Sequence, residues 1–129
     1  MFAEITSSTY SLTDFVMKEV AATLTLPEMG GILGCETNNL VNYFYHDSTG
    51  ISTKKIYIPD TMALNKVIDD WHTQGIKFVG FIHSHSEDRK FLSRLDIKYA
   101  QKIKSYGSMS EVLMVIYLPA DNTFHQYCI

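Results

Sequence analysis

The chain has 129 residues, of which 46% are hydrophobic and 19% are charged, and its formal net charge is −3. These values predict one globular domain over residues 1–129, because a chain of this length can enclose one hydrophobic core and not two. The negative charge gives no electrostatic case for binding nucleic acid or an anionic membrane surface.

The cysteines and the N-terminal residues bear on the cell compartment. Cys35 and Cys128 are far apart in the sequence and neither belongs to a CxxC pair, so no disulfide framework is indicated. The first residues lack the basic and apolar regions of a secretory signal, and no apolar run reaches the length of a membrane span. We therefore expect a cytoplasmic protein that does not insert into membranes.

The first half of the sequence predicts a helix followed by three strands. Ser11 and Asp14 match a capping box at the start of the helix, and Pro27 follows its end. Polar turn residues, such as Asn38 and Asn39, separate the strands. The expected ranges are 11–24 for the helix and 29–36, 40–45 and 54–58 for the strands, of which the first two form a hairpin.

The second half predicts two amphipathic helices and three further strands. Trp71 is expected in the core, and Gly75 and Gly107 follow the ends of the two helices. The last helix should bury an apolar stripe made of Leu92, Leu95, Tyr99, Ile103 and Tyr106. The expected ranges are a helix from residue 60 or 61, a strand at 78–82 that is covered on both faces, a helix at 93–106, a buried strand at 112–118 and an edge strand at 124–128. This order predicts an α/β fold in which helices pack around a mixed sheet.

A polar segment after the buried strand predicts a metal site. If residues 77–83 form a strand, the imidazoles of His83 and His85 project from one face and can meet at the strand's end. Asp96, in the first turn of the next helix, could offer a carboxylate oxygen to the same ion. Two nitrogen ligands and one oxygen ligand make the open zinc arrangement, in which one position is left for water.

Each part of this pattern also has a structural interpretation. Polar residues collect at strand ends without binding a metal, and Ser93 with Asp96 matches a capping box in which Ser93 is the N-cap. The capping box and the metal site are compatible with each other. The joint spacing of the four polar residues favours the metal, because it is a rare coincidence for an average composition.

Glu28 is the candidate acid and base of such a site. It precedes the glycine-rich segment 29–34, which taken alone is typical of a turn between a helix and a strand. A zinc hydrolase also needs a carboxylate outside the coordination sphere, which takes a proton from the bound water and delivers it to the leaving group. Glu28 can supply that carboxylate.

Together these residues resemble a known family. Glu28 followed by Gly-Gly-x-Leu-Gly, and later His83-x-His85, seven residues, Ser93, two residues and Asp96, is similar to the motif of the JAMM (MPN-plus) metalloproteases. The resemblance includes every polar position of that motif and the order of elements over nearly the whole chain. It implies a cytidine-deaminase-like sandwich, with a curved mixed sheet flanked by helices.

The resemblance also implies an activity, a cofactor and a partner. His83, His85 and Asp96 would bind Zn²⁺, Glu28 would be the acid and base, and Ser93 would donate to the oxyanion of the tetrahedral intermediate. Family members hydrolyse amide or isopeptide bonds after the C-terminal glycine of ubiquitin or ubiquitin-like proteins, and prokaryotic relatives act on small sulfur-carrier or modifier proteins. The expected partner is a protein substrate of this class.

The chain departs from the family pattern in one loop. Members often have proline directly after the second histidine and directly before the serine, whereas this chain has Ser86 and Leu92 there. These prolines stiffen the loop and do not touch the metal, so their absence concerns loop rigidity more than metal binding. The loop is also short and lacks the long insertions that help eukaryotic relatives hold ubiquitin.

Two other functions fit part of the sequence. The chain could be a non-catalytic MPN-type interaction module, although such modules are expected to lack some of the chemical positions. It could also be a nucleobase deaminase, but the H-x-E and P-C-x-x-C signatures of that class do not occur here.

Two further features of the sequence bear on the predicted site. Cys35 is expected in a buried strand, yet it closely follows the Glu28 segment and could approach the metal. Arg94, Lys98 and Lys102 recur on one face of the last helix as a basic ridge, which either receives an acidic patch of a protein substrate or is simply a solvated face.

Overall fold

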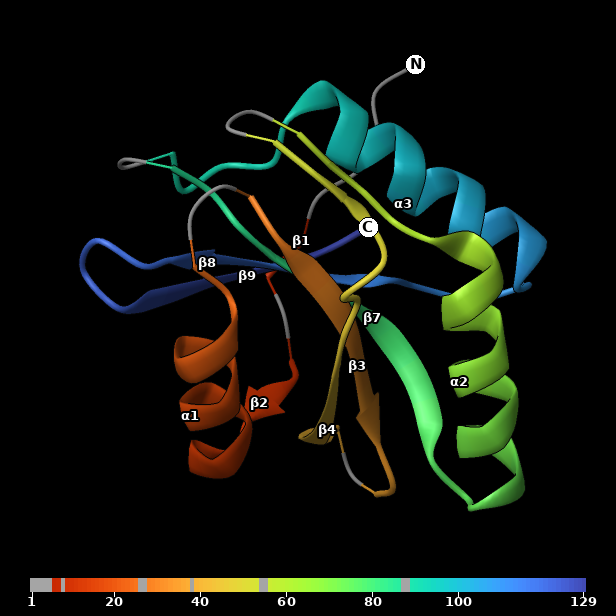
Figure 1. Cartoon of the computed structure of the whole chain (residues 1–129). Helices are drawn as coiled ribbons and strands as arrows, with labels where there is room; N and C mark the ends of the chain where they lie inside the picture. The colour runs from red at the N-terminus through yellow and green to blue at the C-terminus, as the bar shows by residue number, and fades with distance from the viewer. Residues whose placement is uncertain (1–5, 8, 26–27, 38, 54–55, 87–88) are drawn as a thin grey trace.

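The computed structural model describes residues 6–7, 9–25, 28–37, 39–53, 56–86 and 89–129. These residues form a curled mixed sheet with helices on both of its faces (Figure 1). The helices are α1 (Asp14–Thr23), α2 (Thr61–Thr73) and α3 (Arg94–Tyr106). The strands are β1 (Thr6–Ser7), β2 (Ser11–Leu12), β3 (Gly30–Cys35), β4 (Leu40–His46), β5 (Ile51–Ser52), β6 (Tyr57–Ile58), β7 (Lys77–Ser84), β8 (Leu113–Leu118) and β9 (Thr123–Cys128).

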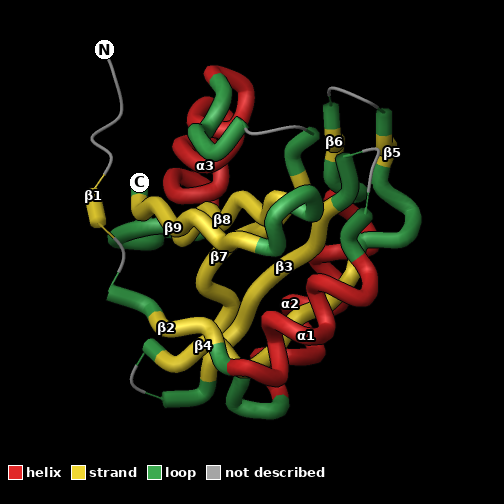
Figure 2. Tube along the Cα trace, turned by 90° about the vertical axis from the view of Figure 1, so that its left-hand side faces the viewer, coloured by secondary structure: helices red, strands yellow, loops and turns green. Residues whose placement is uncertain are grey.

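The main sheet has the strand order β1-β9-β8-β7-β3-β4-β2. The β7–β8 and β2–β4 pairs are parallel and the other neighbours are antiparallel, so the sheet is mixed as the sequence predicts. The predicted hairpin is present as β3 and β4. A separate two-stranded ribbon, β5–β6, lies beside the main sheet (Figure 2).

The central strands are buried on both faces, and each face has its own hydrophobic cluster. Along β3, Leu33 packs with α1 residues such as Val16 and Val20, whereas its neighbour Ile32 packs with Leu64 and Trp71 of α2. This alternation follows from the two-residue period of a strand. It explains why β3, β7 and β8 read as nearly continuous apolar runs, and it confirms the predicted core position of Trp71.

Several local predictions were wrong. The first helix does not begin at Ser11: Thr13 is its N-cap, with Oγ1 accepting from the Val16 N–H at 3.1 Å, and Ser11–Leu12 form β2. The strand at 124–128 is not at the edge of the sheet, because β1 pairs with its outer side. Of the strand predicted at 54–58, Tyr57–Ile58 is observed, while residues 54–55 lie outside the described residues.

The apolar stripe of the last helix is also less buried than predicted. Leu95 is 61% exposed and Tyr106 is 80% exposed, while Leu92, Tyr99 and Ile103 pack partly against the α2 side of the core. An amphipathic pattern identifies the apolar face of a helix, but it does not say whether that face meets a core or lines an open pocket. No helix of the described residues is both long enough and apolar enough to cross a membrane.

Gly80 is needed where β7 passes β8. A Cβ built at this position would lie 1.8 Å from the carbonyl oxygen of Leu113, which belongs to the backbone of the paired strand and cannot move aside. We expect Gly80→Ala to lower the free energy of unfolding by at least about 2 kcal/mol, measured by urea denaturation. The control is Gly75→Ala, whose new Cβ would meet no atom within 4 Å although φ is +78°, so that only backbone strain of about 1 kcal/mol is added. Equal losses in the two variants would contradict this account.

Candidate metal centre

The two histidines of the motif meet at the end of β7. The strand is held on both sides, since His83 lies opposite Gly30 of β3 and Ile116 of β8. His85 continues this path, and its N–H donates to the carbonyl of Tyr117 at 3.1 Å. Both imidazoles are buried, and their Nε2 atoms lie 2.8 Å apart, as predicted from the two-residue spacing.

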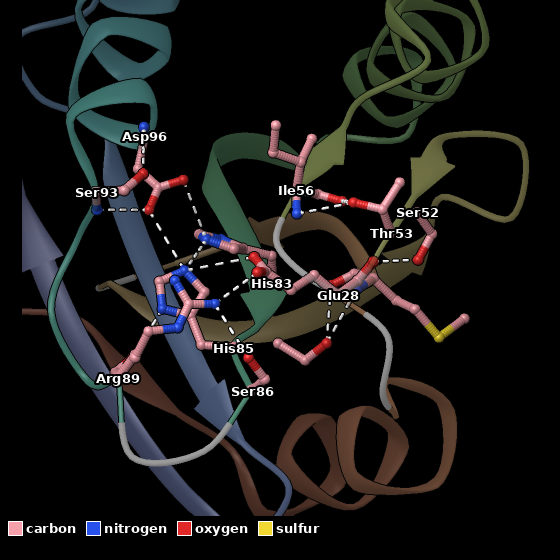
Figure 3. Close-up of polar contacts among 12 residues, drawn as sticks. Glu28, Ser52, Thr53, Ile56, His83, His85, Ser86, Arg89, Ser93 and Asp96 are labelled. Carbon is pink, nitrogen blue, oxygen red and sulfur yellow. Dashed lines mark hydrogen bonds and ion pairs between the residues drawn. The ribbon is translucent and has the colours of Figure 1, made fainter.

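Asp96 reaches the same point from the first turn of α3. One carboxylate oxygen lies 3.2 Å from Nε2 of His83 and the other lies 3.5 Å from Nε2 of His85. The predicted capping box is also present, because the Ser93 N–H donates to Asp96 Oδ2 at 2.8 Å and the Asp96 N–H donates to Ser93 Oγ at 3.1 Å. The cap therefore orients the carboxylate toward the histidines, and both interpretations of Ser93 and Asp96 are supported by the geometry (Figure 3).

Burial and charge act in opposite directions on Asp96. Burial opposes ionisation of its carboxyl, but the contacts with His83 and His85 and the hydrogen bond from the Ser93 N–H outweigh burial and hold its pKa well below the usual range. The carboxylate is therefore charged in the folded protein, which is the state a metal ligand requires.

The spacing of these atoms suits a divalent metal. Four ligands placed tetrahedrally at 2.0–2.1 Å from an ion lie about 3.3 Å from one another. Nε2 of His83 and Nε2 of His85 lie 2.8 Å apart, and each lies near a different oxygen of Asp96: Oδ1 is 3.2 Å from His83 and Oδ2 is 3.5 Å from His85. One carboxylate oxygen of Glu28 and one nitrogen of each histidine all lie within 4.8 Å of one another, so Glu28, His83 and His85 form a buried group that could hold a metal ion. The structure thus contains a buried cluster close enough to bind a metal ion.

Glu28 lies slightly farther back than Asp96. Its Oε1 is 3.8 Å from Nε2 of His85, and its side chain is only 3% exposed. The backbone of Glu28 is fixed by the β5 segment, because its N–H donates to the carbonyl of Thr53 at 2.9 Å and the Ser52 hydroxyl donates to its carbonyl. The structure therefore brings all five predicted site residues together, including Glu28, which is 55 residues away from His83 in the sequence.

Ser84, between the two histidines, attaches the Glu28 segment to β7. Its hydroxyl accepts from the Met29 N–H at 2.9 Å and donates to the carbonyl of Thr25 at 2.9 Å, and its own N–H donates to the carbonyl of Met29 at 2.8 Å. The side chain is fully buried, so these bonds are not replaced by water. The sequence analysis did not predict this role, which requires the tertiary contacts of Ser84 with Thr25 and Met29.

Arg89 is the second residue that the sequence analysis missed. Its Nη2 lies 2.6 Å from Glu28 Oε2 and donates to Ser86 Oγ at 3.3 Å, while its carbonyl lies 2.7 Å from Nδ1 of His85 (Figure 3). A carbonyl oxygen only accepts, so Nδ1 of His85 carries the hydrogen and Nε2 is left as the free ligand atom. One residue thus orients both the proposed acid and one histidine. A lone arginine in a polar loop gave no signal of this in the sequence.

Tyr57 supports the other histidine. Its ring lies over the imidazole of His83, with centroids 6.3 Å apart and planes inclined by 27°, and its hydroxyl donates to Oδ2 of the buried Asp47 at 2.7 Å. Burial and the bond to Asp47 raise the pKa of Tyr57 above its usual value, so it stays neutral. Gly30 leaves room for this ring, because a Cβ there would lie 2.3 Å from Tyr57 Cε2. Packing against Tyr57 therefore explains why the first glycine of the motif, Gly30, carries no side chain.

The site opens into a pocket of about 270 Å³. Its polar side carries the five predicted residues and Arg89, and its apolar side includes the exposed residues Ile58 and Leu95. The exposure of Leu95, unexpected from its helical pattern, is explained by this position. The remaining lining residues are Ile56, Tyr57, Pro59, Phe81, Tyr99 and Met114.

Neither Cys35 nor the basic ridge belongs to the metal cluster. Cys35 is at the far end of β3, opposite Lys77 of β7, whereas His83 lies opposite Gly30 at the near end. Five residues of strand separate these ends by about 16 Å, so Cys35 does not approach the cluster. Burial raises the pKa of its thiol. The residues of the basic ridge, Arg94, Lys98 and Lys102, are all exposed.

Comparisons with known proteins inform the fold. No model of a known protein family matches the chain, and no curated protein matches its sequence. Among solved structures 78 chains match, one of which is the solution structure of protein DSY2949 from Desulfitobacterium hafniense, a Northeast Structural Genomics Consortium target. That match has a TM-score of 0.65 and 21% identity, and it covers 91% of this chain and 80% of the other. At this level of identity the likeness shows a shared fold and carries no activity.

The cluster predicts metal binding with a stoichiometry of one ion per chain. We expect the purified protein to bind one equivalent of Co²⁺ or Zn²⁺, and His83→Ala to lose stoichiometric binding because one nitrogen ligand is removed. His72→Ala is the control, since His72 is exposed on α2 and should keep full binding. Elemental analysis after dialysis measures the metal content. Equal metal content in the two variants would show that the ion binds elsewhere.

Proposed function

We propose that this protein is a zinc-dependent peptidase or isopeptidase of the JAMM (MPN-plus) type, which cleaves after the C-terminal glycine of a ubiquitin-like or sulfur-carrier protein. One observation supports this most strongly: Glu28, His83, His85, Ser93 and Asp96 surround one pocket although they come from separate parts of the chain. The curled mixed sheet with helices on both faces agrees with the cytidine-deaminase-like arrangement that the resemblance implies.

In this proposal, three residues bind zinc and a fourth transfers the proton. His83, His85 and Asp96 would hold zinc, which when bound acts as a Lewis acid and makes a water molecule acidic at neutral pH. Glu28, whose Oε1 lies 3.8 Å from Nε2 of His85, would accept a proton and then give it to the departing amine. Glu28 stays out of the ligand set in this scheme because Asp96 is closer to His85 and already contacts both imidazoles.

Ser93 can stabilise the developing oxyanion. Its Oγ accepts the N–H of Asp96, and a hydroxyl that accepts one bond can still donate its own hydrogen. It lines the pocket at the start of α3, where the helix dipole also favours negative charge. Both features suit a group that binds the oxygen of a tetrahedral intermediate.

The apolar side of the pocket suits the tail of a protein substrate. Ile58 and Leu95 are 48% and 61% exposed beside the polar cluster, so they offer apolar surface that a partner could cover. An extended C-terminal tail ending in glycines is narrow enough to lie against such residues and bring its last amide bond to the cluster. The basic ridge begins one residue after Ser93 and would contact the body of the same substrate.

The role of Glu28 is tested by Glu28→Gln, which preserves the shape of the side chain. We expect this variant to fold normally and to keep its zinc, while turnover of a ubiquitin-like or sulfur-carrier protein extended beyond its C-terminal Gly-Gly falls by about 10²–10⁴-fold. Cleavage is followed by intact-protein mass spectrometry. Near-normal turnover in the variant would remove Glu28 from the mechanism. A wild-type protein with full zinc and no hydrolysis of any conjugate would instead favour a non-catalytic MPN-type module.

The basic ridge predicts a salt-dependent substrate affinity. We expect Lys98→Glu combined with Lys102→Glu to raise KM several-fold at low ionic strength with little change in kcat, because these exposed charges are not in the pocket. Lys66→Glu combined with Lys18→Glu matches the charge change on exposed positions of other helices and should leave KM unchanged. If the two double variants have the same KM, the ridge is only a solvated face.

A further inference from the structure

The segment that follows the two histidines orients the metal centre through one residue, Arg89. Its carbonyl lies 2.7 Å from Nδ1 of His85, and its guanidinium lies 2.6 Å from the carboxylate of Glu28 (Figure 3). The carbonyl keeps its place only if the backbone around it is fixed. The ion pair with Glu28 does not fix it alone, because the flexible arginine side chain lies between the guanidinium and the backbone.

A tyrosine from another element fixes the next peptide of this segment. The hydroxyl of Tyr127 donates to the carbonyl of Lys90 at 2.5 Å, although the two residues are 37 positions apart in the sequence. Lys90 takes part in this bond through its backbone, while its ammonium lies over the ring of Phe91, 5.6 Å from the centroid. The bond therefore acts on the course of the chain and does not depend on the side chain at position 90.

Tyr127 is a rigid base for such a bond. It lies in β9 between Met114 of β8 and Ser7 of β1, so the sheet holds its backbone on both sides. Residues directly opposite each other in an antiparallel pair project to the same face, and Met114 lines the pocket of the metal centre. Burial raises the pKa of the Tyr127 phenol, so the hydroxyl keeps its hydrogen at neutral pH.

Two anchored carbonyls in succession leave this segment little freedom. The carbonyls of Arg89 and Lys90 belong to consecutive peptide planes, each of which is rigid because its C–N bond has partial double-bond character. Only the φ and ψ of Lys90 connect the two planes. With the Lys90 carbonyl held by Tyr127, rotation about these two bonds sets where the Arg89 carbonyl can lie. The tyrosine therefore restricts the group that orients the ring of His85.

We propose that Tyr127 is a positioning residue of the metal centre: its hydroxyl holds residues 89–92 so that the Arg89 carbonyl keeps Nε2 of His85 directed at the ion. This inference rests on the proposed metal centre, and only its effect on turnover depends on the proposed hydrolysis. The ring of a histidine ligand turns about its Cβ–Cγ bond, and the partner of its second nitrogen limits that turn. Loss of such a partner lowers metal affinity by about 10–100-fold.

The first test removes only the hydroxyl, by Tyr127→Phe. We expect the affinity for Co²⁺, measured by competition with a chelator, to fall about tenfold, the lower end of that range, because Tyr127 acts on His85 through one intervening residue. Tyr43→Phe is the matched control, since its hydroxyl also makes one side-chain bond, 2.8 Å to Glu36, and it lies opposite Gly34 at the other end of β3. It should keep the wild-type affinity. Urea denaturation of the two metal-free variants should give similar midpoints, which separates a change in the centre from a loss of fold.

The second test examines His85 directly, without metal. Exchange of its Nδ1 hydrogen with water is measured by NMR on protein with ¹⁵N-labelled histidine, and we expect it to be about tenfold faster in Tyr127→Phe than in Tyr43→Phe or the wild type. A bond that merely stabilised the surface would not change this rate. Exchange at the wild-type rate would overturn the proposal, because Tyr127 would then not act on His85, and so would an unchanged affinity for Co²⁺.

Turnover separates this proposal from the proposed hydrolysis. Tyr127 is not among the described residues that line the pocket, so with saturating zinc we expect Tyr127→Phe to lower kcat several-fold and to leave KM unchanged. The substrate is a ubiquitin-like or sulfur-carrier protein extended beyond its C-terminal Gly-Gly. If the wild type cleaves no such conjugate while affinity and exchange change as expected, hydrolysis is wrong and the role of Tyr127 stands. If conjugates are cleaved while affinity and exchange match the control, the role of Tyr127 is wrong and hydrolysis stands.

Discussion

The contact between the Glu28 segment and the end of β7 is the constraint on which the site depends. Gly30 pairs with His83, and Ser84 uses its N–H and its hydroxyl to hold residues Thr25 and Met29. These bonds place a carboxylate beside two imidazoles that are more than fifty residues away in sequence. Because Ser84 is buried, its bonds have no competition from water, and a small local set of interactions fixes a long-range arrangement.

A buried carboxylate at this position needs a cation, and the loop after His85 supplies it. Arg89 pairs with Glu28 and thereby offsets the cost of removing that charge from water, and its carbonyl fixes the ring of His85. The prolines that often flank this loop in the family it resembles are absent, with Ser86 and Leu92 in their places. The two contacts of Arg89 anchor the described part of the loop by polar bonds, where a proline would act by restricting the backbone.

The sequence predicts the parts of the site that are local and misses the parts that are tertiary. A two-residue spacing at a strand end and a three-residue spacing at a helix start are enough to place His83, His85, Ser93 and Asp96. The roles of Tyr57 and Arg89 depend on which segments fold against each other, and no spacing encodes that. The same limit explains the helix start: Ser11 and Thr13 both suit an N-cap, and the pairing of β2 with β4 selects the second.

The position of Ser93 explains why a structural and a chemical interpretation of one motif agree. The first turn of a helix leaves N–H groups without partners and carries partial positive charge, so it favours a carboxylate at its third position and an oxygen at its cap. Asp96 and Ser93 satisfy that requirement with each other. The same partial charge stabilises Asp96 as an anion beside the histidines and favours an oxyanion beside Ser93. The capping box that stabilises the start of α3 therefore also supplies Ser93 and Asp96, two of the groups that the proposed hydrolysis requires.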